Sequence, residues 1–248
     1  MPWGRPADIR TRTVRSPAYR ARMDMLSGDQ INDAHLTDWR KLAQGLHARY
    51  VVADLRSGVR LLAAVADAVD GLGDHLRATV GDGFLDLKLI TLDAVYRDDD
   101  GNEHGVEWVT EQDLDLARRI SQVAAEHGAR PDTAGIVNIE LALDTAHEKQ
   151  LAPFWSALLT GGQDARGRGT IGNDVRDGQG RVPYLWFQAT DEHETPRQRF
   201  HLDVFVPGEH AQQRIAAALD AGGVVVSEED GFTILADPDG NRACVNLS

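Results

Sequence analysis

Residues 199–206 (RFHLDVFV) and residues 232–245 (FTILADPDGNRACV) decide how the second half of this chain folds. The first stretch alternates apolar and polar side chains, which is typical of a strand with one face exposed to water. The second stretch contains two strand-like runs joined by a turn, because Pro238 fixes φ and Gly240 tolerates a positive φ. Together they predict three strands near the C-terminus, and His201 lies on the first of them.

The region 136–248 is predicted to use one order of elements twice. The second copy reads as strand, helix and three strands, at 199–206, 209–221, 224–227, 231–236 and 242–247. The first copy opens with a strand at 136–143, continues with an apolar helical stripe at 151–158 and reaches a strand at 184–189. Because strands and helices follow one another in this way, we expect a paired βαβββ domain.

Composition excludes several classes of protein. The chain has 248 residues and a formal net charge of −13, so phosphate groups of a nucleic acid would be repelled. It contains one cysteine, Cys244, which rules out an intramolecular disulfide and fits a reducing, cytoplasmic setting. No apolar run approaches the roughly eighteen residues that a membrane helix needs. We therefore expect a small-molecule substrate and neither a nucleic-acid nor a membrane partner.

The first half is predicted to be a separate α+β domain at 26–128, preceded by a basic extension at 1–25 and followed by a linker at 129–135. The extension carries arginines but almost no acids and lacks an apolar core, so it is not a secretory signal. The predicted order of elements in the domain is α-β-α-β-β-α. Its first helix begins at a capping box, Ser27-x-x-Gln30, and its last at Thr110-x-x-Asp113.

The elements between these two caps follow from hydrophobic spacing. An apolar stripe continues the first helix through Ile31, Trp39, Leu42 and Leu46. A second helix spans 55–70, with its apolar face at Val59, Leu62, Ala63, Ala66 and Val69. Strands are predicted at 48–53, 84–92 and 104–109, the last two joined by the acidic turn at 98–102. The turn looks like a calcium loop, but Val109 stands where such a loop needs a glutamate, so calcium is rejected.

Residues 26–127 resemble the pterin-4a-carbinolamine dehydratase family. The residues that carry the resemblance are Leu26-Ser27, Trp39, Tyr50, Asp74-His75 and the stretch 110–117 (TEQDLDLA). The resemblance implies an antiparallel sheet with helices on one face and a homo-oligomer. It also implies metal-free loss of water from a 4a-hydroxytetrahydropterin, with no cofactor and with the reduced pterin as substrate. Imidazoles suit such acid–base work because their pKa lies near the working pH.

The resemblance transfers the family's site only in part. His75 is retained from a pair of histidines, and Asp74 stands in the place of the other. The third histidine is either lost at Leu92, before Asp93, or supplied by His104. We therefore expect His75, His104 and Asp74 as catalytic residues and Asp93 as a substrate contact. The alternatives are a solvated helix cap for His75, a solvated turn for Asp74 and a surface position for His104.

Trp108 is a further substrate candidate in this half, because an indole ring stacks on a flat pterin ring. The competing interpretation is a tryptophan that only packs in the core. A pterin site needs an apolar wall together with polar groups that read the edge of the ring.

The second half resembles the glyoxalase-like branch of the vicinal oxygen chelate superfamily, in which a cupped sheet surrounds a ligand site. Position by position, the resemblance places His201, Gln188 and Cys244 in the cup, together with a first-strand residue near Asn138 or Glu140. The superfamily holds a metal at these positions, but this set is poor for a divalent cation that favours histidine and carboxylate ligands, so we expect a metal-free cup in which His201 and Gln188 hydrogen-bond a ligand or each other. The alternative is zinc held by His201, Glu140 and Cys244.

The remaining expectations about the cup concern single side chains. A half-buried strand histidine and a small buried cysteine are the non-functional interpretations of His201 and Cys244. Asp203 lies two residues beyond His201 on the same strand face, where its carboxylate could orient the imidazole.

The sequence thus supports three hypotheses. The first is a 4a-hydroxytetrahydrobiopterin dehydratase with an appended glyoxalase-like domain. The second is a degenerate dehydratase-like module that serves binding or oligomerisation. The third is a metal-dependent vicinal oxygen chelate enzyme that acts through its C-terminal domain.

Overall fold

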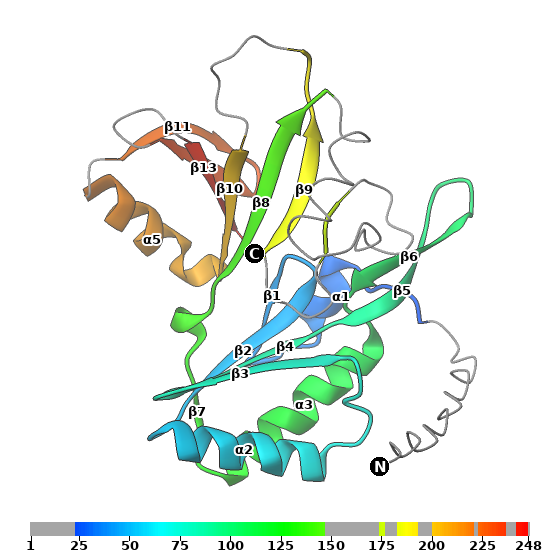
Figure 1. Cartoon of the computed structure of the whole chain (residues 1–248), viewed down its shortest axis with the longest axis vertical. Helices are drawn as coiled ribbons and strands as arrows, with labels where there is room; N and C mark the ends of the chain where they lie inside the picture. The colour runs from blue at the N-terminus through cyan, green and yellow to red at the C-terminus, as the bar shows by residue number, and fades with distance from the viewer. Residues whose placement is uncertain are drawn as a thin grey trace, which may run out of the picture.

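The computed structural model describes residues 23–146, 174–176, 183–192, 200–220, 223–236 and 242–247. Within them the chain has the α+β class that the sequence predicts, with an antiparallel sheet in the first half and a mixed sheet in the second (Figure 1). Three predictions lie wholly or mostly outside the described residues: the basic extension, the helical stripe at 151–158 and the turn at 237–241.

The N-terminal sheet is antiparallel and has helices on one face. Its strands lie in the order β1 (Arg40–Leu42), β2 (Gly45–Val51), β4 (Phe84–Leu89) and β3 (Leu76–Gly81), and β7 (Arg130–Pro131) pairs with β2. The helices α2 (Leu55–Ala68) and α3 (Glu111–Glu126) lie beneath it (Figure 1). Residues 129–135, expected as a linker, thus contribute β7 and a short 3₁₀ turn, Thr133–Gly135.

Alternation along the strands decides what each face of this sheet carries. On β4, Leu85, Leu87 and Leu89 are buried in the core cluster that also contains residues of α2 and α3. The intervening positions face away from the helices, since side chains of a strand alternate. There Lys88 lies opposite His47 of β2 and Arg77 of β3, so the second face of the sheet carries positive charge.

Two predicted helical patterns in this half are wrong. The first helix, α1 (Gly28–Asp33), has the expected capping box but stops early, because the backbone turns to a positive φ of 49° at His35. Leu42 and Leu46 are therefore buried in strands β1 and β2. In α2 the buried residues include Leu61 and Val65, whereas Val59 is 53% exposed. Apolar spacing alone did not separate these alternatives.

Two strand predictions also change in detail. The predicted strand at 84–92 is β4 followed by β5 (Thr91–Arg97), which forms a hairpin with β6 (Glu103–Trp108). The sequence did not predict β3, because its short sequence LRATVG ends in glycine and contains only two large apolar residues, Leu76 and Val80. It is a strand because it pairs along its full length with the buried β4.

The C-terminal sheet has six strands in the order β11-β12-β13-β10-β8-β9. Their bounds are β8 (Asn138–Thr145), β9 (Tyr184–Ala189), β10 (Phe200–Val206), β11 (Val224–Glu229), β12 (Phe232–Ala236) and β13 (Arg242–Leu247). The helix α5 (Gly208–Asp220) packs on one face, where Ile215 meets Val206 and Val245. The predicted βαβββ order of the second copy is confirmed, and β8 and β9 are the described strands of the first copy.

The two halves are linked by ion pairs. Arg40 of β1 contacts Glu209 of α5 at 2.6 Å, and Arg176 lies 3.3 Å from Glu107 of β6. The second face of the N-terminal sheet thereby lies toward the C-terminal half, where Glu140 on β8 feels the charges of Lys41 and Lys88. Across the described ranges, no helix combines the length and the hydropathy needed to span a membrane.

Candidate functional site in the C-terminal cup

A cavity of about 800 Å³ lies on the face of the C-terminal sheet that is opposite α5. Its walls come from five strands and mix aromatic, carboxylate and amide side chains. The lining residues that the chemistry uses are Glu140, Asp144, Trp186, His201, Asp203 and Cys244. A cavity of this size, largely apolar with a few convergent polar groups, is typical of a small-molecule site.

Strand register places these side chains in rows across the sheet. Asp203 on β10 lies opposite Glu140 on one side and Cys244 on the other. In the row toward one end of the cup, Asn246 lies between Phe205 and Phe232. Toward the other end Asp144 lies beside Gln188, which is exposed. The cup therefore has an apolar end and a polar end.

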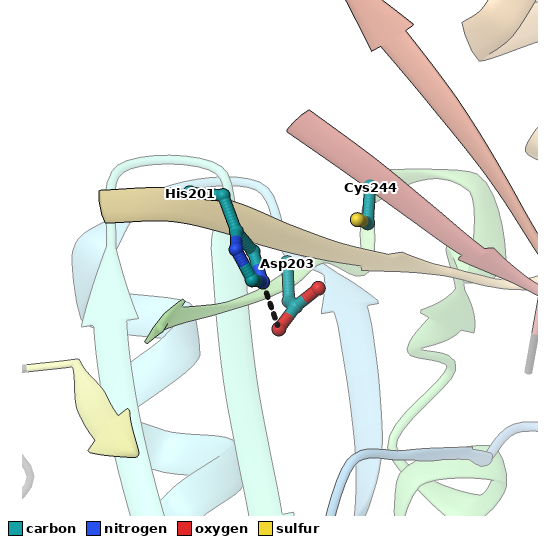
Figure 2. A group of neighbouring side chains, drawn as sticks. All are labelled: His201, Asp203 and Cys244. Carbon is teal, nitrogen blue, oxygen red and sulfur yellow. Dashed lines mark ion pairs between the residues drawn. The ribbon is translucent and has the colours of Figure 1, made fainter. Parts of the chain in front are cut away.

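His201 lies in this cavity between two carboxylates. Its Nε2 atom is 3.6 Å from Asp203 Oδ2 and its Nδ1 atom is 3.6 Å from Asp144 Oδ1. Figure 2 shows the imidazole turned toward Asp203. Asp203 raises the pKa of His201, with a smaller contribution from Asp144, and burial only partly opposes them. Both are ion-pair distances, longer than a tight hydrogen bond.

Asp203 is the fixed member of this group. It is 7% exposed, and its two oxygens accept hydrogen bonds from Trp186 Nε1 at 3.1 Å and Asn246 Nδ2 at 3.4 Å. Burial alone would raise the pKa of Asp203, but His201 and these two donors hold it below its usual value. The indole of Trp186 also packs edge-on against the His201 ring, with 5.9 Å between centroids. Asp203 thus faces the imidazole from the same side of the strand, as its spacing in the sequence suggested.

Cys244 completes a possible set of metal ligands. Donor atoms of His201, Asp203 and Cys244 lie within 4.8 Å of one another, on neighbouring strands (Figure 2). Burial, and then the nearby Asp203, raise the pKa of the Cys244 thiol to about 11, so a cation would have to displace its proton. An imidazole, a carboxylate and a thiolate are donors that zinc accepts. The sequence suggested Glu140 as the third metal ligand beside His201 and Cys244. The structure brings Asp203 into that set instead, because Asp203 lies on the strand between those of Glu140 and Cys244.

Glu140 lies in the floor of the cup, where the two halves meet. It is 4% exposed, and burial raises its pKa to about 7, although Gln44 hydrogen-bonds to its carboxyl group. Asp203 raises the pKa further, while Lys88 and Arg176 oppose the rise. Glu140 is therefore a buried acid that titrates near neutral pH.

The two candidate histidines of the N-terminal half have different partners. His75 is 5% exposed, and its Nδ1 atom is 2.8 Å from Asp113 Oδ1 and 3.3 Å from Thr91 Oγ1. Asp113 is fully buried and accepts further hydrogen bonds from Thr91 Oγ1 and the Thr110 N–H. His75 is thus part of a buried network at the start of α3 rather than a solvated helix cap.

His104 lies in a different environment, on the β5–β6 hairpin. Its Nε2 atom is 2.9 Å from Asp98 Oδ2, and its ring lies beside Tyr96. The hydrogen-bond partner of His104, Asp98, differs from those of His75, which are Asp113 and Thr91. Nothing in the described contacts brings these two imidazoles to one substrate.

Of the three remaining candidates, Asp74 directly precedes His75, and Trp108 pairs across the hairpin with Thr91, whose hydroxyl contacts His75. Asp74 is exposed, and its carbonyl oxygen accepts a hydrogen bond from Arg77. Asp93 is an exposed residue of β5. Trp108 donates its indole N–H to the Leu26 carbonyl at 2.8 Å and packs against the core, with the Lys41 amine 3.9 Å above the ring. Trp108 therefore has the packing role that the sequence left open.

Sequence reasoning missed Asp144 and Trp186 as parts of the cup. The signal was present, because Glu140 and Asp144 are four residues apart and lie on one face of a strand. The predicted strand ended at residue 143, one residue before Asp144, so Asp144 was not considered, whereas β8 continues to Thr145. Trp186 was treated as core, yet it shares its row with His201 across the small side chain of Ala142.

Comparisons with known proteins agree with this two-part organisation. The model of the family described as "Glyoxalase-like domain" matches residues 140–246. The N-terminal region matches a transcriptional coactivator/pterin dehydratase from Brucella melitensis, at 20% identity and a TM-score of 0.32 over 41% of this chain and 99% of that one. A hypothetical protein from S. aureus matches at 20% identity and a TM-score of 0.19, over 43% of this chain and 93% of that one. No curated protein matches the sequence. The resemblances that the motifs predicted are confirmed, with no activity attached to them.

Proposed function

We propose that the C-terminal cup is an active site in which His201 transfers a proton to or from a small organic molecule. The observation that carries this proposal is the position of His201 inside the cavity, between the carboxylates of Asp144 and Asp203. Two carboxylates favour the protonated imidazole, which makes His201 a proton donor near neutral pH. A strand histidine with only a packing role would not need this pair of partners.

The other residues of the cup have roles that follow from their positions. Asp203, fixed by Trp186 and Asn246, keeps the imidazole oriented while its charge changes. The rings of Phe205 and Phe232 lie at the apolar end and would bind the apolar part of the substrate. The reacting group would then lie at the polar end, beside His201. The substrate class is therefore an amphipathic molecule small enough for the cavity.

The same residues fit a divalent cation of the zinc type. His201, Asp203 and Cys244 would hold it, and a bound cation would polarise a substrate oxygen as a Lewis acid. Loading requires deprotonation of Cys244, so the affinity would rise with pH. That the cup works without a cofactor stays a prediction.

Exchange of carbon-bound protons tests the proposal directly. A mixture of small amphipathic carbonyl compounds is incubated with the protein in D₂O, and deuterium uptake is followed by NMR. We expect catalysed exchange that falls by roughly 100-fold or more in His201→Gln, the range typical of a lost acid–base group. The matched control is His35→Asn at an exposed histidine whose positive φ suits asparagine.

Two outcomes would reject the assignment of His201. One is the absence of catalysed exchange, and the other is exchange that His201→Gln leaves unchanged. Elemental analysis of the same samples then separates the two forms of the site. Zinc that survives dialysis of the native protein but is lost in both His201→Gln and Cys244→Ser would identify His201 as a ligand instead of a proton donor.

A second candidate function is metal-free loss of water from a 4a-hydroxytetrahydropterin in the N-terminal half. The observation that favours it is the buried contact of His75 Nδ1 with Asp113, which fixes the ring and leaves Nε2 for proton transfer. Turnover of 4a-hydroxytetrahydropterin is followed by ultraviolet absorbance. Loss of the reaction in His75→Gln, with activity retained in His201→Gln, would support a dehydratase.

The degenerate-module hypothesis gives the N-terminal half a role in binding or oligomerisation instead of catalysis. It predicts no pterin turnover by the native protein, together with a homo-oligomer in solution. Light scattering at several protein concentrations measures the second of these. A monomer without dehydratase activity would remove this hypothesis as well.

A further inference from the structure

Glu140 has an oxygen that the described part of the chain leaves without a hydrogen bond. Its Oε1 atom is buried and accepts none, although the residue is only 4% exposed and lines the cavity. Asp144 Oδ1, also in the wall of the cup, is the second such atom, with His201 Nδ1 3.6 Å away. Folded proteins rarely leave a buried acceptor unpaired, and the exceptions call for a physical reason.

The N-terminal half holds Glu140 in this position. Gln44, in the turn between β1 and β2, hydrogen-bonds to the carboxyl group. Lys88 attracts it from the second face of the N-terminal sheet, Lys41 attracts it from the edge strand β1, Arg176 adds a third positive charge, and Asp203 repels it from the neighbouring strand. Because Gln44 engages the carboxyl group and Oε1 has no partner, the carboxyl group is fixed in the wall of the cavity with one acceptor left unsatisfied.

We propose, on the basis of the proton-transfer function proposed above, that Glu140 selects the ligand of the cup by accepting a hydrogen bond from an N–H or O–H group. The ligand class is an apolar or aromatic molecule that carries an amide, amine or hydroxyl donor. Its apolar part lies against Phe205 and Phe232, and its donor reaches the floor of the cup. Gln44 is a positioning residue, so the ligand site is complete only with the N-terminal half in place.

A ligand carboxylate is disfavoured at the floor of the cup. It offers no donor, so it would leave Glu140 Oε1 unpaired, whereas His201 and Arg242, which also line the cavity, would attract it to another part of the wall. A donor-bearing neutral or cationic molecule satisfies that atom.

Pairs of probes that differ only in the donor test this selection. Benzamide and acetophenone have the same shape, with NH₂ in the first where the second has CH₃, and 2-aminopyridine and 2-methylpyridine form a second pair. Dissociation constants are measured on the full chain by ligand-observed NMR. We expect the donor-bearing member to bind about tenfold more tightly, the value of one hydrogen bond to a buried carboxyl group.

Variants assign the preference to Glu140. In Glu140→Leu the preference should fall to about onefold, whereas Glu228→Leu, a strand glutamate outside the cavity, should retain it. Gln44→Leu leaves Glu140 in place but removes its support, so we expect an intermediate preference. This second variant keeps the test valid if Glu140→Leu does not fold. His201→Gln should keep the preference, which separates ligand selection from proton transfer.

The possible results divide as follows. Equal binding of both members of each pair by the native protein overturns the selection by Glu140 and leaves the role of His201 intact. A preference that persists in Glu140→Leu, or that Gln44→Leu does not reduce, overturns it too. If no probe binds, the selection is overturned and the cup also loses its support as a binding site.

Discussion

The two halves of the molecule each pair a histidine with an aspartate, and the two pairs are built differently. In the N-terminal half, His75 Nδ1 is 2.8 Å from an Asp113 that is fully buried and bonded to two threonines. In the C-terminal half, His201 Nε2 is 3.6 Å from Asp203, and both side chains line an 800 Å³ cavity. The first pair is closed by the protein, and the second is open to a ligand.

The difference comes from the elements that carry the two aspartates. Asp113 is the third residue of α3, where its carboxylate caps the helix and is covered by the core. Asp203 lies on a strand whose alternate side chains face the cavity. The same two residue types therefore stabilise one half and provide chemistry in the other. The predictions below test this contrast.

The largest expected effect is on stability and should be confined to the closed pair. Asp113→Ala removes one partner of a buried network and should lower the free energy of unfolding by about 3–5 kcal/mol. Asp203→Ala removes hydrogen bonds at the edge of a cavity and should cost about 1–2 kcal/mol. Urea unfolding followed by circular dichroism measures both. Equal losses would show that the two pairs do not differ in kind.

The cup should also contain a group that reduces stability at neutral pH. Burial raises the pKa of Glu140 to about 7, so the folded protein keeps a proton that the unfolded chain releases near pH 4.5. The raised value means that stability is lost as pH rises from about 4.5 to about 7. Glu140→Gln removes this loss and should stabilise the protein by about 2–3 kcal/mol at pH 8, with little effect at pH 4.

Thermal unfolding of Glu140→Gln and the native protein at both pH values checks this prediction. The matched control is Glu228→Gln, at an exposed strand position, which should leave the stability unchanged at both pH values. A stability difference that does not depend on pH would mean that Glu140 does not titrate in the cup.

A third effect concerns the charge of the open pair. Asp203 raises the pKa of His201, so the stability from this pair is fully present below the ordinary histidine pKa of about 6.5. It is lost as pH rises through the folded value. Asp203→Asn should lower the pKa of His201 toward the ordinary value, as measured by NMR titration of the imidazole carbon-bound protons. No change in the titration would place the charge of His201 under the control of Asp144.

The smallest effect should come from the exposed contact between the halves. Arg40 and Glu209 form an ion pair at 2.6 Å, but their side chains are 27% and 44% exposed. Exposed pairs of this kind contribute little, so Arg40→Ala should change the free energy of unfolding by less than about 1 kcal/mol. A larger loss in urea unfolding would make this pair, rather than the buried contacts near Glu140, the main link between the halves.

Local patterns predicted a large part of this architecture. The alternation in residues 199–206 indicated β10, and the capping motifs at Ser27 and Thr110 located the starts of α1 and α3. These succeed because the groups that interact are close in sequence. The stripe from Ile31 to Leu46 failed because a chain reversal at Ala43, with a φ of 48°, turns apparent helical spacing into the hairpin of β1 and β2.

The candidate site was predictable only as a set of separate residues. His201, Cys244, Gln188 and Glu140 were each expected in the cup, and all four line the cavity. Asp144 was missed because the predicted strand ended before it. The contact of His75 with Asp113 could not be predicted from the sequence either, since these two residues meet through the packing of distant elements. The same is true of the absence of a shared partner between His75 and His104 among the described contacts.

The sequence by itself determined the α+β class, the order of elements in the second half and the face on which His201 lies, since these depend on alternation and capping between near neighbours. The tertiary structure decided which carboxylate meets which imidazole, and it brought Gln44 of one half to Glu140 of the other. The physical reason is that strand register and the packing of the two halves fix distances between residues that no local pattern relates.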